Sequence, residues 1–516
     1  MRLGLLIAIV PALAAVPAFC QVRVPSGDKV TVSAKWDTVV RVSETIPTTQ
    51  HLANAFTLRS SPLNKPLLKS LRDLHTNYTR LQLWFSVPNQ AVAELKEATA
   101  TETFWNFQYI DPVVIDFFAN TREVHHVNFG TIPRWMFNVP PIDLPTDPGA
   151  SFYAYTKGTS ESLLKDPTGK QFADYQARIF QWYTQGGFTD EIGHYHRSDY
   201  HFKIDIWGIL NETDLENHIG VEQYTKIYDA VVIAIRKIDP SVQFMGPEVN
   251  GAQRILPWAK YFLNSKNHDP AALPVQWFSL HNYVKGSNDP ATWQAIYFTE
   301  LSSSGQRASA LAFGDLLREL IKVRDQLSPM TKIGIDELGT FNVVNPGDDV
   351  ASSEESYSAY SPLYWVATGA NWAELFITAE NVGIPLISMT QMVGAPTQSE
   401  SCSMINWNTA HPNAHYWVLK LISDNFGPGD KLVATQSSST DVVAQASITS
   451  SGRKILLVNT SNRTLRVSLA GAVQESRHRI AVVDEASGEK QPRRGHVTGQ
   501  LIELSPFAVA VISPGK

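Results

Sequence analysis

Residues 203–212 read KIDIWGILNE, a mostly apolar run rich in isoleucine that ends in an asparagine and a glutamate. Residues 332–337 read KIGIDE and end in a similar way, in Asp336 and Glu337. Runs of this kind are typical of strands that are buried on both faces, as in a parallel sheet. An acidic residue where such a strand stops indicates a candidate site at the carboxyl edge of the sheet.

Outward from these two runs, short strand-like segments alternate with amphipathic helical segments from about residue 47 to residue 425. We expect strands near residues 51–57 and at 80–85, 124–129, 203–210, 243–247, 276–280, 332–336 and 385–391. We expect helices at residues 64–75, 109–120, 171–185, 221–238, 252–264, 309–326, 352–370 and 412–425. Eight such units predict an α/β fold, a closed (β/α)8 TIM barrel over residues 47–430. A doubly wound open sheet is the alternative, but it usually has fewer repeats, and no glycine-rich phosphate turn follows the first strand.

The two ends of the chain have a different texture. Residues 431–516 contain short alternating runs separated by Ser, Gly and Asn turns, which predict a C-terminal antiparallel β-sandwich domain. The segment 21–46 contains a similar run and is expected to join that sandwich. Residues 1–20 combine one basic residue with a short apolar run, which is typical of a secretory signal peptide cleaved after Cys20. A membrane anchor is the competing interpretation, but the apolar run is too short to span a bilayer.

Composition limits the class of protein and its partners. Of 516 residues, 43% are hydrophobic and 18% are charged, which suits a folded chain and excludes a disordered one. The net charge of -6 and the lack of a basic run argue against a nucleic acid partner. The 13 Trp and 17 Tyr favour a carbohydrate partner, because their rings pack against sugar faces, although core packing accounts for most of them. We therefore expect a secreted protein, extracellular or periplasmic, with no membrane insertion once the signal is removed.

The expected barrel mouth gathers the residues that carry chemistry. Glu212 ends the fourth strand and Glu337 the seventh, and glycoside hydrolysis needs two such carboxyl groups, one as acid and one as nucleophile. The amide of Asn211 can bond the sugar 2-hydroxyl in the transition state. His281 and Tyr283 end the sixth strand, where a tyrosine can orient the nucleophile and a histidine can bond a sugar hydroxyl or the acid. Packed loop residues and solvated acids are the competing interpretation for each of these positions taken alone.

Ordered motifs along the barrel resemble those of a known family. WGILNE at 207–212, YTKIYDA at 224–230 and IDPSVQFMGP at 238–247 resemble glycoside hydrolase family 39 and its relatives in clan A. Supporting motifs are WNFQYIDPVV at 105–114, FGTIPRWM at 129–136, SLHNY at 279–283 and the pair at 336–337. The resemblance extends from about residue 51 to residue 425.

The resemblance implies a retaining glycosidase with Glu212 as acid/base and Glu337 as nucleophile. It also implies that Asn211, His281, Tyr283 and Trp207 bind the substrate or contact the nucleophile. Family members act on β-xylosides, α-L-iduronides and some other glycosides, so an oligo- or polysaccharide-derived, β-xyloside-like substrate is expected. No cofactor and no metal are expected, because two carboxyl groups suffice for this chemistry.

Two departures from the family pattern affect substrate choice. Thr213 replaces the usual proline after the Asn-Glu pair, and the eighth strand lacks the tryptophan that often lines the sugar subsite. Trp365, Trp372 and Trp407 are candidate replacements. A uronidase or endo-glycanase of the same clan therefore stays open, with Lys285 or Arg134 as partner for a uronate carboxylate. A non-catalytic carbohydrate-binding protein on a barrel scaffold is the alternative from another class.

Histidine clusters outside the expected mouth could in principle bind a metal. His194, His196 and His201 precede the fourth strand, and His125 and His126 begin the third. Both groups fall at the amino ends of strands, opposite the catalytic face, which favours structural roles. Arg80, near the start of the second strand, is expected either in the mouth or buried with a carboxylate partner.

Overall fold

The structure, a computed structural model, describes residues 29–299, 310–341, 360–395, 400–473 and 477–515. The predicted signal peptide, residues 1–20, lies outside the described residues. No helix of the described part is long and apolar enough to cross a bilayer.

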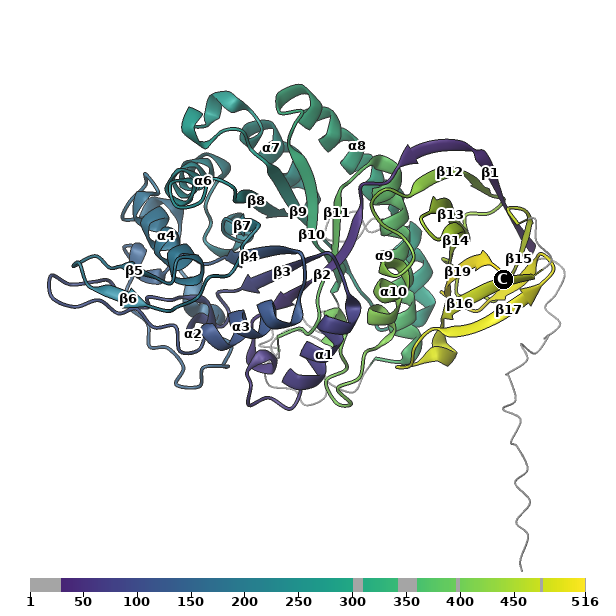
Figure 1. Ribbon diagram of the computed structural model, residues 1–516, viewed down its shortest axis with the longest axis horizontal. Helices are drawn as coiled ribbons and strands as arrows, with labels where there is room; N and C mark the ends of the chain where they lie inside the picture. The colour runs from purple at the N-terminus through teal and green to yellow at the C-terminus, as the bar shows by residue number, and fades with distance from the viewer. Residues whose placement is uncertain (1–28, 300–309, 342–359, 396–399, 474–476, 516) are drawn as a thin grey trace, which may run out of the picture.

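Eight parallel strands close into a barrel (Figure 1), which confirms the predicted TIM-barrel fold. Around the barrel they follow the order β10-β11-β2-β3-β4-β7-β8-β9. The strands are β2 (Ile46–Leu52), β3 (Tyr78–Leu83), β4 (Val124–Phe129), β7 (Ile206–Gly208), β8 (Gln243–Asn250), β9 (Trp277–Lys285), β10 (Lys332–Phe341) and β11 (Leu386–Met389). The first strand begins earlier than its predicted range of 51–57, because Thr48, Thr49, Gln50 and His51 are polar although they are buried, and they hide the apolar pattern.

Helices surround the barrel and bury their apolar faces against the strands. α6 shows the rule: Tyr224, Ile227, Val231 and Ile235 lie on one face at helical spacing, and all are buried. The helices are α1 (Asn64–Leu74), α2 (Pro88–Ala91), α3 (Asp111–Asn120), α4 (Lys170–Thr184), α5 (Thr213–Glu216), α6 (Val221–Arg236), α7 (Ala252–Phe262), α8 (Ala310–Leu327), α9 (Pro362–Val382) and α10 (Ala414–Ser423).

The helix predicted at 352–370 is placed wrongly along the chain. α9 begins at Pro362 and continues to Val382, and residues 352–359 lie outside the described part. Nearly every residue of α9 is buried, because this helix lies between the barrel and the C-terminal domain (Figure 1). A helix that is apolar all round carries no amphipathic period to mark its bounds.

The C-terminal domain is a nine-stranded, mainly antiparallel sheet that encloses its own apolar core. Its strand order is β17-β16-β19-β14-β13-β12-β1-β15-β18, which includes β1 from the start of the described chain. The bounds are β1 (Lys29–Val42), β12 (Lys431–Ser437), β13 (Val442–Thr449), β14 (Gly452–Asn459), β15 (Leu465–Gly471), β16 (Arg477–Val483), β17 (Arg493–Thr498), β18 (Leu501–Leu504) and β19 (Val509–Pro514).

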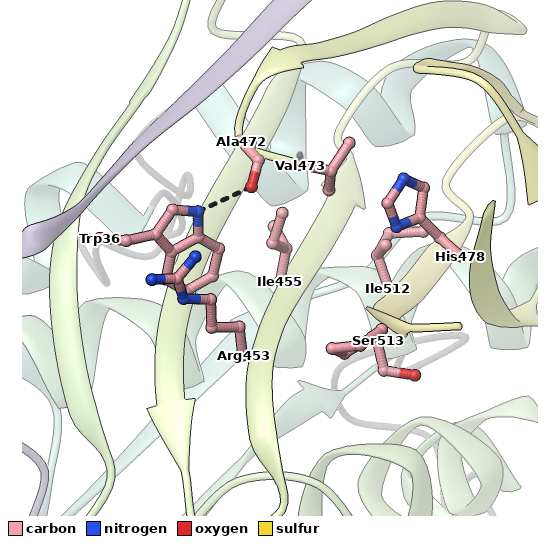
Figure 2. A pocket seen from close by; sticks show the side chains of 9 residues that line it. Trp36, Arg453, Ile455, Ala472, Val473, His478, Ile512 and Ser513 are labelled. Atoms are coloured by element: carbon pink, nitrogen blue, oxygen red, sulfur yellow. Dashed lines mark hydrogen bonds between the residues drawn. The ribbon is translucent and has the colours of Figure 1, made fainter. Parts of the chain in front are cut away.

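Strand β1 is fixed in this domain by pairing and by one tryptophan. It pairs antiparallel with β12 and parallel with β15. Figure 2 shows that the indole nitrogen of Trp36 donates to the carbonyl of Ala472, at 2.8 Å. The guanidinium of Arg453 lies over the Trp36 ring at 5.1 Å from its centroid. The two ends of the described chain therefore meet in one domain beside the barrel.

Inside the barrel, an apolar layer closes the amino end and a polar layer lies above it. The apolar layer consists of Tyr78, Ile206, Met245, Trp277 and Leu386. Alternate residues of a strand point to the same side, so the side chains two positions further on also face the interior. On three of these strands they are polar and buried: Arg80, Ser279 and Ser388. The interior therefore becomes polar toward the carboxyl ends of the strands, where the candidate site lies.

Candidate active site

The structure brings Glu212 and Glu337 together at the carboxyl end of the barrel. Glu212 follows β7, and Glu337 lies on β10 at an irregularity in the pairing with β9. Both carboxylates contact Nδ1 of His281, Glu212 through Oε1 at 2.6 Å and Glu337 through Oε2 at 3.4 Å. The contacting atoms of the three residues all lie within 4.8 Å of one another. Two carboxyl groups at this spacing can act on the two atoms of one substrate bond.

Glu337 is held as an anion by donors on two sides. Arg80 donates to its Oε1 at 2.6 Å, and the hydroxyl of Tyr283 donates to its Oε2 at 2.5 Å. Burial alone raises the pKa of Glu337, but the charges of His281 and Arg80 and the two hydrogen bonds outweigh it, so the pKa lies below its usual value. Glu337 is therefore ionised at neutral pH and can act as a nucleophile.

His281 is a buried cation between acids. Its Nδ1 contacts Glu212, and its Nε2 lies 3.5 Å from Oδ1 of the buried Asp336. Burial lowers the pKa of His281, but the charges of Glu337 and Asp336 outweigh it and raise the pKa well above its usual value. The ring therefore carries a proton on both nitrogens and donates to the carboxylates around it.

Asn211 is oriented by contacts at both ends of its amide. Its oxygen accepts a hydrogen bond from Arg80 at 2.9 Å, and its nitrogen donates to Oε1 of Glu216 at 2.7 Å. The same oxygen of Glu216 accepts a hydrogen bond from the indole nitrogen of Trp84, also at 2.7 Å. The amide predicted to contact the sugar is thus rigidly placed beside Glu212, with the half-buried ring of Trp84 next to it.

A buried ion pair lies beneath these residues, and Glu248 is the part of it that the sequence did not reveal. Glu248 lies near the carboxyl end of β8 and is fully buried, and Arg80 pairs with it as well as with Glu337. Both oxygens of Glu248 accept from the amide of Asn128 at 2.7 Å. Burial lowers the pKa of Arg80, but the negative charges of Glu248, Glu337 and Asp336 outweigh burial and raise this pKa above its usual value. The expected carboxylate partner of Arg80 is therefore present, and Arg80 joins it to Glu337.

One signal in the sequence could have revealed Glu248. It follows Gly246 and Pro247 at the end of an apolar strand, the position that singled out Glu212 and Glu337. Its backbone has a φ of 53°, in the left-handed region. Non-glycine residues adopt this region rarely, and such residues often mark functional positions.

The prediction that Trp207 binds substrate is wrong. Trp207 is fully buried between β7 and α4, where its ring packs against Phe129 and Phe180 and its nitrogen donates to Gln176 at 2.9 Å. The physical reason is strand alternation: Ile206 faces the barrel interior, so Trp207 points outward into the helix layer.

Trp365, Trp372 and Trp407, the candidate replacements for the missing tryptophan, lie in two different parts of the structure. Trp365 and Trp372 are buried side chains of α9. Trp407 packs against Phe56 with ring centroids 5.0 Å apart and donates to Ser403 at 2.9 Å. All three rings are buried, so none of them presents a free face comparable to the half-buried Trp84.

The suggested partners of a uronate carboxylate gain no support. Arg134 is engaged with backbone carbonyls, at 3.2 Å to Pro140, 2.8 Å to Tyr155 and 2.9 Å to Lys157. The side chain of Lys285 lies outside the described part of the structure.

In the part of the chain that the structure describes, two groups of side chains are close enough to hold a metal ion: Glu212, His281 and Glu337, and Glu248, His281 and Asp336. Both groups depend on His281. A histidine ligand must be neutral, whereas the surrounding acids raise the pKa of His281 well above its usual value. The histidine cluster before β7 is engaged elsewhere, since His196 contacts Asp190 at 2.8 Å on the hairpin of β5 (Gly187–Thr189) and β6 (Tyr195–Arg197).

Two sequence comparisons each match part of the chain. Residues 439–512 match the family model described as D-apionate lactonase, C-terminal immunoglobulin-like domain. A β-xylosidase of Geobacillus stearothermophilus is 22% identical to this chain over 250 residues. That match covers 48% of this chain and 44% of the relative, so the chain spans less than half the length of the protein it matches.

Several solved structures have the same overall architecture as this chain, over nearly its whole length. The GH51 arabinofuranosidase from Xanthomonas axonopodis pv. citri superposes with a TM-score of 0.61 at 12% identity, over 94% of this chain and 100% of its own. A monomeric β-xylosidase from Caulobacter crescentus CB15 gives 0.57 at 13% identity, over 95% of this chain and 100% of its own. A bifunctional glucanase-xylanase from a metagenome library also gives 0.57, at 14% identity, over 95% and 100%. The sequence-based resemblance to clan A glycoside hydrolases is thereby confirmed, and the fold is one that these enzymes share.

Proposed function

We propose that this protein is a retaining glycoside hydrolase in which Glu337 is the nucleophile and Glu212 the acid/base. The observation that carries the proposal is the spacing of the two carboxylates, whose oxygens lie within 4.8 Å of each other and of one shared histidine nitrogen. Retaining enzymes keep their carboxyl groups about 5 to 5.5 Å apart, whereas inverting enzymes need roughly 6.5 to 9.5 Å to admit a water.

The contacts of Glu337 suit the first chemical step. Its carboxylate attacks the anomeric carbon and forms a glycosyl-enzyme ester while the bond to the leaving oxygen breaks. Arg80 and Tyr283 keep it ionised and fix its orientation. Burial, and next the charge of Glu337, raise the pKa of Tyr283 well above its usual value, so Tyr283 keeps its proton and donates throughout.

The contacts of Glu212 suit an acid/base. Among the described residues its hydrogen bonds come from His281 at 2.6 Å and Asn250 at 2.9 Å, and both fall on Oε1. Oε2 is thereby left to carry the proton that the leaving oxygen receives. In the second step a water gives its proton to Glu212 and attacks the anomeric carbon, whose bond to the Glu337 oxygen breaks. This second displacement releases the sugar with its original anomeric configuration and regenerates the Glu337 carboxylate.

The substrate class that fits best is a neutral, β-xyloside-like glycoside derived from plant or microbial polysaccharide. Support comes from the names of the similar proteins, which include β-xylosidases and an arabinofuranosidase. Export, through the signal peptide predicted at residues 1–20, belongs to the same proposal, because polysaccharides are met outside the cell.

A panel of 4-nitrophenyl glycosides tests the proposal: β-xyloside, α-arabinofuranoside, β-glucoside and β-glucuronide. We expect the wild-type protein to hydrolyse at least one of them, and Glu337→Gln to lose at least about 10³-fold in kcat. Glu222→Gln, an exposed change on α6, is the matched control and should leave kcat unchanged. Undiminished turnover by Glu337→Gln would refute the assignment.

A further inference from the structure

A large cleft lies on the catalytic face beside the candidate active site. It has a volume of about 780 Å³ and is formed by the loops that follow β3 and β4, residues 84–110 and 130–169. Loops that follow barrel strands all lie at the carboxyl end of the barrel, as Glu212 and Glu337 do. Strand β4 is also the neighbour of β7, after which Glu212 stands. The cleft therefore lies on the Glu212 side of the barrel mouth.

Aromatic side chains connect the candidate active site to this cleft. Trp84 shares the Glu216 carboxylate with Asn211, the residue before Glu212. The ring of Tyr153 packs edge-on against Trp84, with centroids 5.6 Å apart, and 42% of Tyr153 is exposed. Tyr153 belongs to a short 3-10 helix, η3 (Tyr153–Thr156), which also carries Tyr155 in the cleft wall. Trp84 and Tyr153 therefore connect Asn211 to the short helix that contributes Tyr155 to the cleft wall.

The cleft is held in shape before any ligand arrives. The indole nitrogen of Trp135 donates to the carbonyl of Glu94 at 2.7 Å, which fixes a half-buried aromatic ring in the wall. The backbone of Asn138 donates to Leu163 at 2.7 Å, which joins the two ends of the second loop. An ion pair between Lys165 and Glu97, at 2.5 Å, connects the second loop to the first.

The chemistry of the lining suits a neutral ligand with both apolar faces and hydroxyl groups. Rings and prolines form one part of the wall: Trp135, Phe137, Tyr155, Pro140 and Pro141. The charged residues of the rim have opposite signs, since Lys96, Arg134 and Lys165 are offset by Glu97 and Asp143. Sugars combine apolar ring faces with hydroxyl edges and match this arrangement.

We propose that this cleft binds the sugar units of a neutral oligosaccharide beyond the unit held between Glu212 and Glu337. The proposal rests on the proposed function, and it makes the substrate a chain of several sugars rather than a simple glycoside. A cleft of this volume is in the range that holds a ligand of disaccharide size.

Kinetics with two kinds of substrate test the proposal. Aryl glycosides report on the carboxylate pair, whereas β-1,4-xylotetraose and α-1,5-arabinotetraose also reach the cleft. Tyr153→Ala removes the exposed ring, and Asn138→Trp fills the cleft from an exposed position in its lining. We expect each variant to lower kcat/KM for the better tetraose about tenfold relative to that for the aryl glycoside. An unchanged ratio in both variants would overturn the proposal.

A matched control is available at an exposed tyrosine that does not line the cleft. Tyr195→Ala removes a ring that is 63% exposed, on the hairpin that precedes β7. This change should leave the ratio of the two kcat/KM values unaltered. If it lowers the ratio as much as Tyr153→Ala does, the effect does not come from the cleft and the proposal fails.

Binding measured without turnover separates the cleft from the chemistry. Calorimetric titration of Glu337→Gln with each tetraose, and with xylose or arabinose alone, should show at least about tenfold tighter binding of one tetraose. Adding Asn138→Trp should abolish that gain. Equal affinity for tetraose and monosaccharide would contradict the cleft proposal even if aryl glycosides are hydrolysed. Tight tetraose binding by Glu337→Gln, with no hydrolysis of either tetraose or of any aryl glycoside by the wild-type protein, would support the cleft and refute the proposed function.

Discussion

Glu248 offers the sharpest test of how the site is supported. It is fully buried, its oxygens accept two hydrogen bonds from Asn128 at 2.7 Å, and it pairs with the fully buried Arg80. Breaking a buried ion pair by removing one partner costs about 3 to 5 kcal/mol, because the remaining charge is left uncompensated. Arg80 keeps Glu337 at 2.6 Å, so we expect Glu248→Ala to cost about 3 kcal/mol, the lower end of that range.

The same substitution should alter the pH dependence of catalysis. Burial raises the pKa of Glu248 well above its usual value, the charge of Arg80 lowers it, and the charges of Asp336 and Glu337 add to the rise. The negative charge that Glu248 carries when ionised in turn opposes ionisation of Glu337, so its removal favours the ionised form of Glu337. The pKa of Glu337, already below its usual value, falls further. Glu248→Gln keeps the shape of the side chain. In this variant the acid limb of the pH profile of kcat/KM should therefore move to lower pH. Arg80 then binds Glu337 more closely and kcat falls.

Thermal unfolding and pH profiles measure these effects. For a domain as large as the barrel, a loss of about 3 kcal/mol lowers Tm by roughly 6 °C. Glu380→Gln is the matched control: Glu380 is also buried, accepts from Ser43 at 3.0 Å and has a pKa raised by burial to about 8, so glutamine resembles its neutral form. An unchanged Tm for Glu248→Ala together with an unchanged acid limb for Glu248→Gln would refute the supporting role of Glu248.

Three further perturbations have definite expected results. Tyr283→Phe removes a hydrogen bond that lowers the pKa of Glu337. The acid limb of the pH profile of kcat/KM should therefore move to higher pH, and kcat should fall about 10- to 100-fold. An acid limb at the same pH as in the wild-type protein would contradict the contact. Trp207→Ala should cost about 3 to 5 kcal/mol in unfolding experiments, with KM unaltered in the folded protein, because the ring packs outside the barrel. Burial raises the pKa of Glu374 from 4.5 to about 8, so the folded state binds the proton more tightly and stability is lost as pH rises through this window. Glu374→Gln should therefore raise Tm more at pH 9 than at pH 5, and an equal change at both would show that Glu374 is not buried as described.

The fold could be predicted because its repeating unit is local. The strand predicted at 332–336 begins at the residue where β10 begins, since a buried parallel strand is a short apolar run between helices. The first strand was misplaced because IPTTQHL is polar, and only the closed barrel explains why Thr48, Gln50 and His51 are buried. α9 was misplaced for the opposite reason, because a helix that is buried all round has no polar face.

The candidate site was predictable only in part, because the sequence shows which residues end a strand but not which way they point. Glu212, Glu337, Asn211, His281 and Tyr283 lie together as expected, although their catalytic roles remain proposals. Trp207 lies in the same motif, yet the strand's two-residue period turns it outward. The pairing of Arg80 with Glu248 joins residues 168 positions apart, a contact that no local pattern encodes.

Identification of the covalently labelled residue tests the central claim most directly. A 2-deoxy-2-fluoro glycoside of the sugar that the enzyme hydrolyses slows the second step, so that the glycosyl-enzyme accumulates. Peptide mapping by mass spectrometry should then find one sugar attached to Glu337. A label on Glu212 or Glu248, or release of the opposite anomer with no label at all, would contradict the account.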